Sequence, residues 1–180
     1  MPADKPSREA STKIDFTAVV NEHWNSVYRL VHTLGGSVHE AEDMTQETFL
    51  RALDRLDGFQ PDTNMRAWLL RIATNAFFDE KRKKKRSKLQ AMVADIPVVE
   101  ITAGHDLETA EQAALARAAM KELTELTRLV FHLRVQEDLS FRDIAEMAGT
   151  TEQSARWHMH QARTKLLARL GEKSPGGGDT

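Results

Sequence analysis

The chain has 180 residues, of which 41% are hydrophobic and 29% are charged, and its formal net charge at pH 7 is −2. This composition is ordinary for a soluble globular protein. The sequence contains no cysteine, which excludes disulfides and thiol chemistry. No apolar run approaches the ~20 residues of a membrane-spanning helix, and the first 13 residues lack the apolar core of a signal peptide. We therefore expect a cytoplasmic protein without membrane insertion.

The residue pattern favours an all-α fold. Ala, Leu, Glu, Arg and Met recur, whereas alternation of β-branched or aromatic residues with polar ones is rare. The segment after residue 88 contains a proline, a glycine and several acids without a helical period, so we interpret it as a linker. The predicted organisation is two small helical domains, residues 14–88 and 108–171, joined by a flexible linker over residues 89–107.

The residue pattern of the N-terminal half predicts three helices. Apolar residues recur at three- and four-residue steps from Phe16 to Leu34, and two glycines follow. Ser37, with Glu40 three residues later, has the spacing of a capping box for a second helix that runs to about Leu56, before Gly58. A third helix is expected from about residue 65 into a basic run.

The C-terminal half has the pattern of a helix-turn-helix. Ser140 is a candidate N-cap for a short helix that Gly149 ends, and Thr150 or Thr151 is a candidate N-cap for a second helix through about Leu170. No acidic residue occurs from position 153 to 170, so the second helix has a basic outer face that suits a DNA major groove. Two ordinary amphipathic helices remain the alternative.

Two charge clusters need an explanation. Lys81 to Lys88 reads KRKKKRSK, which suits either a solvated helix end or contact with DNA phosphates. The acidic cluster of the second helix (Glu40, Glu42, Asp43 and Glu47) suits a solvated face or docking on a basic partner helix better than a metal site. Motifs of nucleotide-binding, hydrolytic and metalloprotease enzymes are absent from the sequence. We therefore predict neither catalytic residues nor a metal or other cofactor.

Two stretches in order resemble the extracytoplasmic-function sigma factors, the smallest members of the main bacterial sigma family. AEDMTQETFLRAL (residues 41–53) with AWLLRIATNAFFDEKRKKKR (residues 67–86) resembles their region two. LTELTRLVFHLRVQEDLSFRDIAEMAGTTEQSARWHMHQARTKLLARL (residues 123–170) resembles their region four. The resemblance implies a transcription initiation factor that binds RNA polymerase core, recognises promoter DNA and helps to open it. It also implies contacts with the clamp helices of the largest polymerase subunit and the flap of the second largest, and an anti-sigma factor as a partner.

The resemblance assigns three sets of residues. The polymerase-binding set is Glu42, Asp43, Gln46, Glu47 and Phe49. The set for the minus-ten element, where region two holds a flipped base, is Asp62, Thr63, Asn64, Asn75, Lys81, Arg82, Lys84 and Lys85. The set for the minus-thirty-five element is Gln153, Arg156, Trp157, His160, Gln161 and Arg163.

The chain departs from the family pattern at several positions. Leu123-Thr124 replaces the usual Leu-Pro that opens region four, Trp157 replaces a small polar residue, and Gln161 replaces a basic one. These changes bear on the minus-thirty-five sequence rather than on the docking mode, and Trp157 is expected either in the groove or in the core. Two other functions stay open: a conventional helix-turn-helix regulator with an N-terminal sensing domain, and an adaptor that binds polymerase without recognising promoters.

Overall fold

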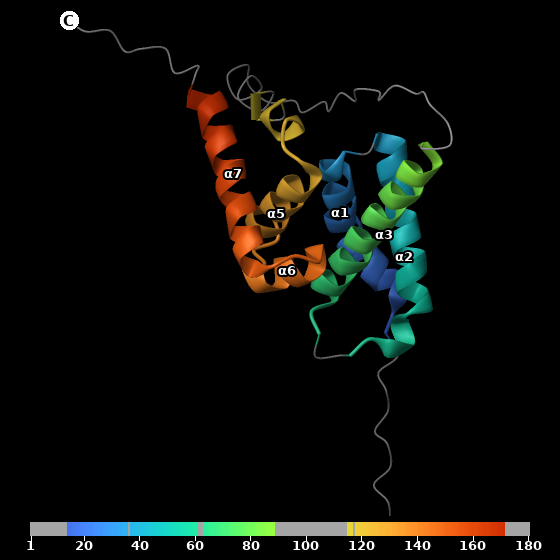
Figure 1. Cartoon of the computed structure of the whole chain (residues 1–180). Coiled ribbons are helices and arrows are strands. Elements are labelled where there is room, and N and C mark those ends of the chain that lie inside the picture. The colour runs from blue at the N-terminus through green and yellow to red at the C-terminus, as the bar shows by residue number, and fades with distance from the viewer. Residues whose placement is uncertain (1–13, 36, 61–62, 89–114, 117, 172–180) are drawn as a thin grey trace, which may run out of the picture.

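The computed structural model describes residues 14–35, 37–60, 63–88, 115–116 and 118–171, and the elements in these ranges are helical (Figure 1). The N-terminal helices are α1 (Phe16–Leu34), α2 (Val38–Asp54) and α3 (Met65–Lys88), with a short 3-10 turn η1 (Leu56–Gly58) after α2. The C-terminal helices are α5 (Glu125–Val135), α6 (Phe141–Ala148) and α7 (Glu152–Gly171). The expected all-α fold is confirmed; the linker expected at 89–107 lies outside the described residues.

Local side-chain caps fix the ends of α1 and α2. The Asp15 carboxylate accepts hydrogen bonds from the first backbone N–H groups of α1, and Gly35 ends that helix with φ 113°, a left-handed conformation that favours glycine. Both hydrogen bonds of the predicted capping box are present between Ser37 and Glu40. Helix α2 ends at Asp54, slightly earlier than the sequence pattern predicts, because the chain tightens there into η1.

The C-terminal helices form the predicted helix-turn-helix. Thr124 caps α5, and Ser140 caps α6 by accepting the backbone N–H of Asp143 at 3.1 Å. Gly149 follows α6 with φ 62°, and Thr151 rather than Thr150 accepts the N–H of Ser154 at the start of α7. The turn therefore holds α6 and α7 at a fixed angle.

The two groups of helices pack against each other, which the sequence does not predict. Helix α5 lies beside α1, and α6 lies against α3 (Figure 1). One contiguous cluster of buried side chains joins both groups, with Leu30 and Leu69 on one side and Leu129, Leu133 and Ile144 on the other, all fully buried. Helix α2 and helix α7 lie on opposite outer sides of this arrangement.

Candidate nucleic-acid and partner surfaces

Helix α2 presents a continuous outer face that combines acids with exposed leucines. This outer face of α2 consists of residues at three- and four-residue steps, all of them exposed: Asp43, Gln46, Glu47, Leu50, Leu53 and Asp54. Leu50 is 59% exposed and Leu53 is 49% exposed. Exposed large apolar side chains within a charged rim are typical of protein-binding surfaces.

Two of the residues predicted for polymerase binding lie outside this outer face of α2. Phe49 is only 5% exposed and stacks on Trp24 with ring centroids 5.8 Å apart, so its side chain belongs to the core and supports the helix from beneath. Glu42 is exposed, one residue before the face. Sequence reasoning missed Leu50 and Leu53, although their helical spacing from Asp43 was a usable signal.

Ion pairs connect the α2 acids to α3. Glu47 pairs with Arg51 at 2.7 Å, and Arg51 lies 3.9 Å from Asp79 of α3. Glu40 accepts the backbone N–H of Ser37 and a hydrogen bond from Lys84 at 3.1 Å, and these interactions hold the pKa of Glu40 below its usual value. Charge changes at Glu47 or Glu40 therefore alter the packing of α2 on α3 as well as the surface.

The residues predicted for the minus-ten element lie at the start and along the exposed side of α3. The Asn64 side chain accepts the backbone N–H of Ala67 at 3.2 Å and so caps α3, and Thr63 donates its N–H to the carbonyl of Gln60. Asn75 is exposed three turns into the helix. Asp62 lies outside the described residues.

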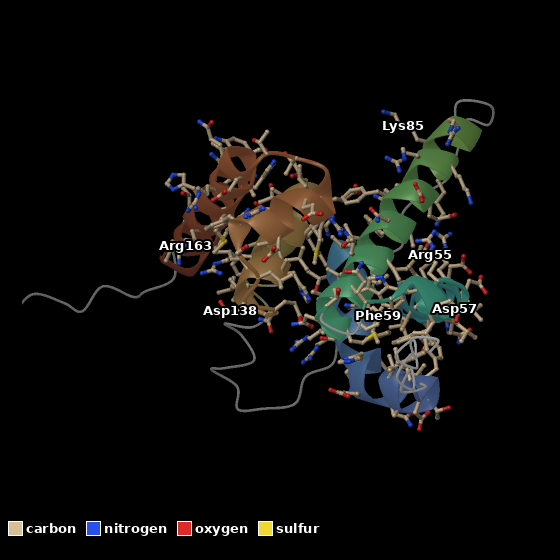
Figure 2. All side chains as sticks on the ribbon, turned by 90° about the horizontal axis from the view of Figure 1, so that it is seen from below. Arg55, Asp57, Phe59, Lys85, Asp138 and Arg163 are labelled. Atoms are coloured by element: carbon tan, nitrogen blue, oxygen red, sulfur yellow. The ribbon has the colours of Figure 1, made fainter. Side chains whose placement is uncertain are left out.

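The basic run forms the exposed C-terminal end of α3. Its cations are exposed at every position from 81 to 86, and Figure 2 shows Lys85 projecting from this end. Three of the four cations predicted to contact DNA have acidic partners: Lys81 pairs with Glu125 of α5, Arg82 pairs with Asp79, and Lys84 pairs with Glu40. DNA phosphates would have to replace these carboxylates.

Helix α7 carries an exposed polar and aromatic face. This outer face of α7 consists of Gln153, Arg156, Trp157 and His160, all exposed. Trp157 is 56% exposed, so it lies at the surface and not in the core, which was the other expected position. Arg163 is also exposed, whereas Gln161 is half-buried at the edge. Ala155, Met159 and Ala162 are buried and fix the opposite side of the helix against the core.

Neighbouring residues orient the outer face of α7. The Arg156 guanidinium lies over the Phe141 ring, 4.6 Å from its centroid, and donates to Glu152 at 2.5 Å. The Trp157 ring meets His158 edge to face. His158 Nδ1 is 2.9 Å from the Thr127 hydroxyl of α5, and burial lowers the pKa of His158. His158 thus holds α7 to α5 and does not belong to the outer face.

Within the described ranges, no helix is long and apolar enough to cross a membrane. The same residues contain no group of three or more histidine, aspartate or glutamate side chains arranged to hold a metal ion.

Two family models match the chain in order. The model for sigma-70 region 2 matches residues 19–87, which include most of α1, all of α2 and nearly all of α3, and the model for sigma-70 region 4 matches residues 113–166, which include α5, α6 and most of α7. The matches therefore coincide with the two groups of helices that carry the outer faces of α2 and α7.

Curated relatives agree with these matches. The chain is 33% identical over 140 residues to the ECF RNA polymerase sigma factor EcfG of Rhodopseudomonas palustris, covering 77% of this chain and 75% of that protein. It is 32% identical over 159 residues to the ECF RNA polymerase sigma factor SigE of Mycolicibacterium smegmatis, covering 87% of this chain and 62% of the longer relative. It is 29% identical to SigW of Bacillus subtilis, covering 86% and 88% of the two chains.

Solved structures share the fold. The sigma factor RpoE of Bartonella quintana, crystallised with the anti-sigma factor NepR, superimposes with a TM-score of 0.75 at 23% identity, covering 88% of this chain and 98% of RpoE. CnrH, in complex with the cytosolic domain of CnrY, gives a TM-score of 0.60 at 26% identity, covering 88% and 89% of the two chains. The arrangement of α1–α3 and α5–α7 thus recurs in both proteins.

Proposed function

Because the chain belongs to the extracytoplasmic-function sigma factors, we propose that it binds the RNA polymerase core, recognises the minus-thirty-five and minus-ten elements of a set of promoters and helps to open the DNA. The observation that carries this function is the presence of both sigma regions in one chain, each with an exposed face of the appropriate chemistry. The chain performs no covalent step, since the polymerase makes the RNA. It works in the cytoplasm, where polymerase and promoters are.

The outer face of α2 is the surface that docks on the polymerase clamp helices. Asp43 and Asp54 supply negative charge at its two ends, and Leu50 and Leu53 supply apolar area between them. This combination suits a basic helix with apolar residues along its contact line, because charge selects the partner while buried apolar area supplies affinity. Phe49 contributes indirectly, by packing against Trp24 and keeping α2 in place.

Helix α3 is the element that captures the minus-ten strand. The Asn75 amide offers donors and an acceptor to an extruded base, and the exposed cations at 81–86 neutralise the phosphates that follow it. Extrusion costs a few kcal/mol of lost stacking, and contacts to the base and the phosphates offset that cost. Asn64 caps α3 and so serves mainly to fix the position of the helix.

Helix α7 is the element that enters the major groove at the minus-thirty-five site. The side chains of Gln153 and Arg156 suit adenine and guanine edges respectively, and the exposed Trp157 ring offers apolar contact to a thymine methyl. Arg163 and His160 lie farther along the helix, where they suit phosphates. Since α6 is fixed to α7 by the Gly149 turn, region four docks as one body.

An anti-sigma factor is the further partner that we propose. The structures that resemble this chain include the sigma factor RpoE bound to the anti-sigma factor NepR, and CnrH bound to the cytosolic domain of CnrY. Such a partner would compete for the polymerase-binding face or for the surface of region four that meets the flap.

Reconstituted transcription tests the proposed function. Core polymerase lacking sigma is mixed with the purified chain and a library of promoter fragments, and full-length transcripts are sequenced. Specific initiation that requires both components is the expected result, with core alone as the control. A conventional helix-turn-helix regulator would instead bind duplex DNA without polymerase, and an adaptor would bind core without selecting any promoter; either result would refute the proposal.

A further inference from the structure

Two departures from the family pattern, Thr124 and Trp157, are connected in the structure by two side chains between them. The hydroxyl oxygens of Thr124 and Thr127 are 2.8 Å apart, and the Thr127 hydroxyl oxygen is 2.9 Å from Nδ1 of His158. The His158 ring contacts the adjacent Trp157 ring, with centroids 4.9 Å apart and an interplanar angle of 80°. We call Thr124, Thr127 and His158 the hydroxyl–imidazole network.

The hydroxyl–imidazole network crosses the contact between α5 and α7, which lie side by side in Figure 1. Thr124 is exposed at the start of α5, Thr127 is buried and His158 is half-buried. Packing alone orients an imidazole poorly, because the torsion about the bond to its ring has broad minima. The hydrogen bond between the Thr127 hydroxyl and Nδ1 therefore fixes the plane of the His158 ring.

The hydrogen bonds of this network depend on one another. The Thr127 hydroxyl has one hydrogen and lies between the Thr124 hydroxyl and His158 Nδ1. When it donates to one neighbour it accepts from the other, so loss of the Thr124 hydroxyl also weakens the bond to His158. The Thr124 end is held by the helix cap, since the Thr127 backbone N–H donates to Thr124 Oγ1 at 3.3 Å. Burial lowers the pKa of His158, which keeps its ring neutral at neutral pH.

The orientation of Trp157 matters for its proposed contact with DNA. An indole ring contacts a thymine methyl only when the ring is presented at the correct angle, and side chains that read a ligand need such support from their neighbours. The neighbouring Arg156 is held by the Phe141 ring and by Glu152. Trp157 is 56% exposed, and its ring contact is with His158. The plane of the His158 ring therefore determines how the indole is presented.

We propose that the hydroxyl–imidazole network positions the Trp157 ring for contact with one base pair of the minus-thirty-five element, so that two threonines of α5 help to set promoter specificity. The inference rests on the proposed function of α7 and adds the residues that orient its aromatic contact. Thr127 and His158 are positioning residues, because Thr127 is buried and His158 lies behind the outer face of α7.

Thr127→Val tests the network with little change in shape. Valine keeps the β-branched side chain and the backbone N–H that Thr124 caps, but it removes the hydroxyl. Thr127→Ser restores the hydroxyl and should restore the behaviour of the parent chain. The matched control is Thr45→Val, the same substitution at a fully buried threonine of region two, whose hydroxyl donates to the Ala41 carbonyl at 2.6 Å.

Thr124→Pro gives a second, independent test. Thr124 has φ −64°, which matches the φ of proline, so the residue usual in the family suits the backbone at this position. The substitution removes the hydroxyl at the exposed end of the network and leaves Thr127 and His158 in the chain. Thr124→Ser retains the hydroxyl and is the control for this variant.

Fluorine NMR reports the surroundings of the Trp157 ring directly. The chain contains three tryptophans, so 5-fluorotryptophan gives three resonances, and Trp157→Phe identifies the one of interest. Thr127→Val and Thr124→Pro are expected to shift or broaden this resonance without loss of helix content by circular dichroism. The two serine variants and Thr45→Val are expected to leave it as in the parent. A Trp157 resonance that is identical in the parent, Thr127→Val and Thr124→Pro would overturn the positioning role.

Promoter selection tests the effect on specificity. Holoenzyme containing each variant selects from promoters randomised across the minus-thirty-five element, and Trp157→Ala identifies the base pair whose preference depends on the indole. A direct base contact discriminates roughly 5- to 150-fold, so Thr127→Val is expected to reduce the preference at that base pair at least about threefold. Preferences at the other positions are expected to stay as in the parent. A loss spread evenly over all positions would overturn the inference, because the network would then support α7 as a whole.

The same selection separates this inference from the proposed function. If Trp157→Ala alters a preference but Thr127→Val and Thr124→Pro do not, the network does not position Trp157, and the proposed role of α7 stands. If Trp157→Ala alters no preference, Trp157 reads no base pair and the inference is overturned. A parent holoenzyme that selects no minus-thirty-five sequence would refute the proposed function, and the effect on specificity with it.

Discussion

Truncation of Leu50 tests whether the outer face of α2 is the polymerase-binding surface. The Leu50 side chain is 59% exposed and lies outside the buried core cluster, so Leu50→Ala should leave the fold intact. Full burial of a leucine side chain stabilises a complex by about 1.5–3 kcal/mol relative to exposure. Somewhat more than half of the Leu50 surface is exposed and can become buried in the complex, and alanine keeps Cβ. The expected loss of binding free energy is therefore about 1–1.5 kcal/mol. This corresponds to a roughly 5- to 12-fold weaker Kd for polymerase core.

The assay is a titration of fluorescently labelled chain with core polymerase, followed by anisotropy. Val38→Ala is the matched control, because Val38 is a 38% exposed apolar residue of the same helix that lies outside the outer face. Asp43→Asn is expected to cost less than Leu50→Ala, since exposed ion pairs contribute only about 0.2–1 kcal/mol. An unchanged Kd for Leu50→Ala, or an equal loss for Val38→Ala, would refute the assignment of this face.

Three further predictions concern DNA binding and stability. Asn75→Ala should leave assembly with core intact but reduce promoter opening, measured by permanganate footprinting; equal opening would exclude a base contact. Trp157→Ala should change the minus-thirty-five sequences selected from a randomised library, since a direct base contact contributes about 1–3 kcal/mol of discrimination, whereas a uniform loss of affinity would indicate a phosphate or sugar contact. His158 should make region four less stable in acid: burial lowers its pKa below the ordinary value of 6.5, so its stabilising effect is complete above that pH and is lost as the pH falls through the lower folded-state pKa. Thermal unfolding at about pH 7.5 and 5.5 should therefore show a smaller pH effect in His158→Gln than in the parent chain, and identical pH effects would contradict this role.

The helices and their ends were predictable because their signals are local. Ser37, Ser140 and Gly149 act on backbone groups within one turn, so their spacing in the sequence is enough to place helix ends. The exposed position of Trp157 could not be predicted from the sequence, because an aromatic side chain is equally suited to packing in a protein core and to contacting a DNA groove. In the structure, Ala155 and Met159 fill the buried side of α7, so Trp157 lies on the exposed side.

The docking of the two regions was not predictable, because it depends on residues far apart in the chain. Ser26 and Glu137 are separated by 111 positions, and no periodicity connects them. The sequence around Glu137 has the appearance of a solvated turn, yet in the structure the Glu137 side chain is 1% exposed and lies beside Ser26 of α1 and Arg66 of α3. The inward position of Phe49 was missed for a related reason: a family motif identifies which residues matter without showing which of them reach the surface.

The contacts of Arg156 have a thermodynamic consequence for recognition of the minus-thirty-five element. Phe141 lies beneath the Arg156 guanidinium and Glu152 accepts its hydrogen bond, so a long and otherwise freely rotating side chain is already ordered before DNA arrives. Ordering such a side chain costs about 0.5–1.5 kcal/mol when it occurs on binding, and here most of that cost is met during folding. In the proposed role of α7 at the minus-thirty-five element, Phe141 would therefore contribute to promoter affinity from beneath the binding surface, through conformational entropy.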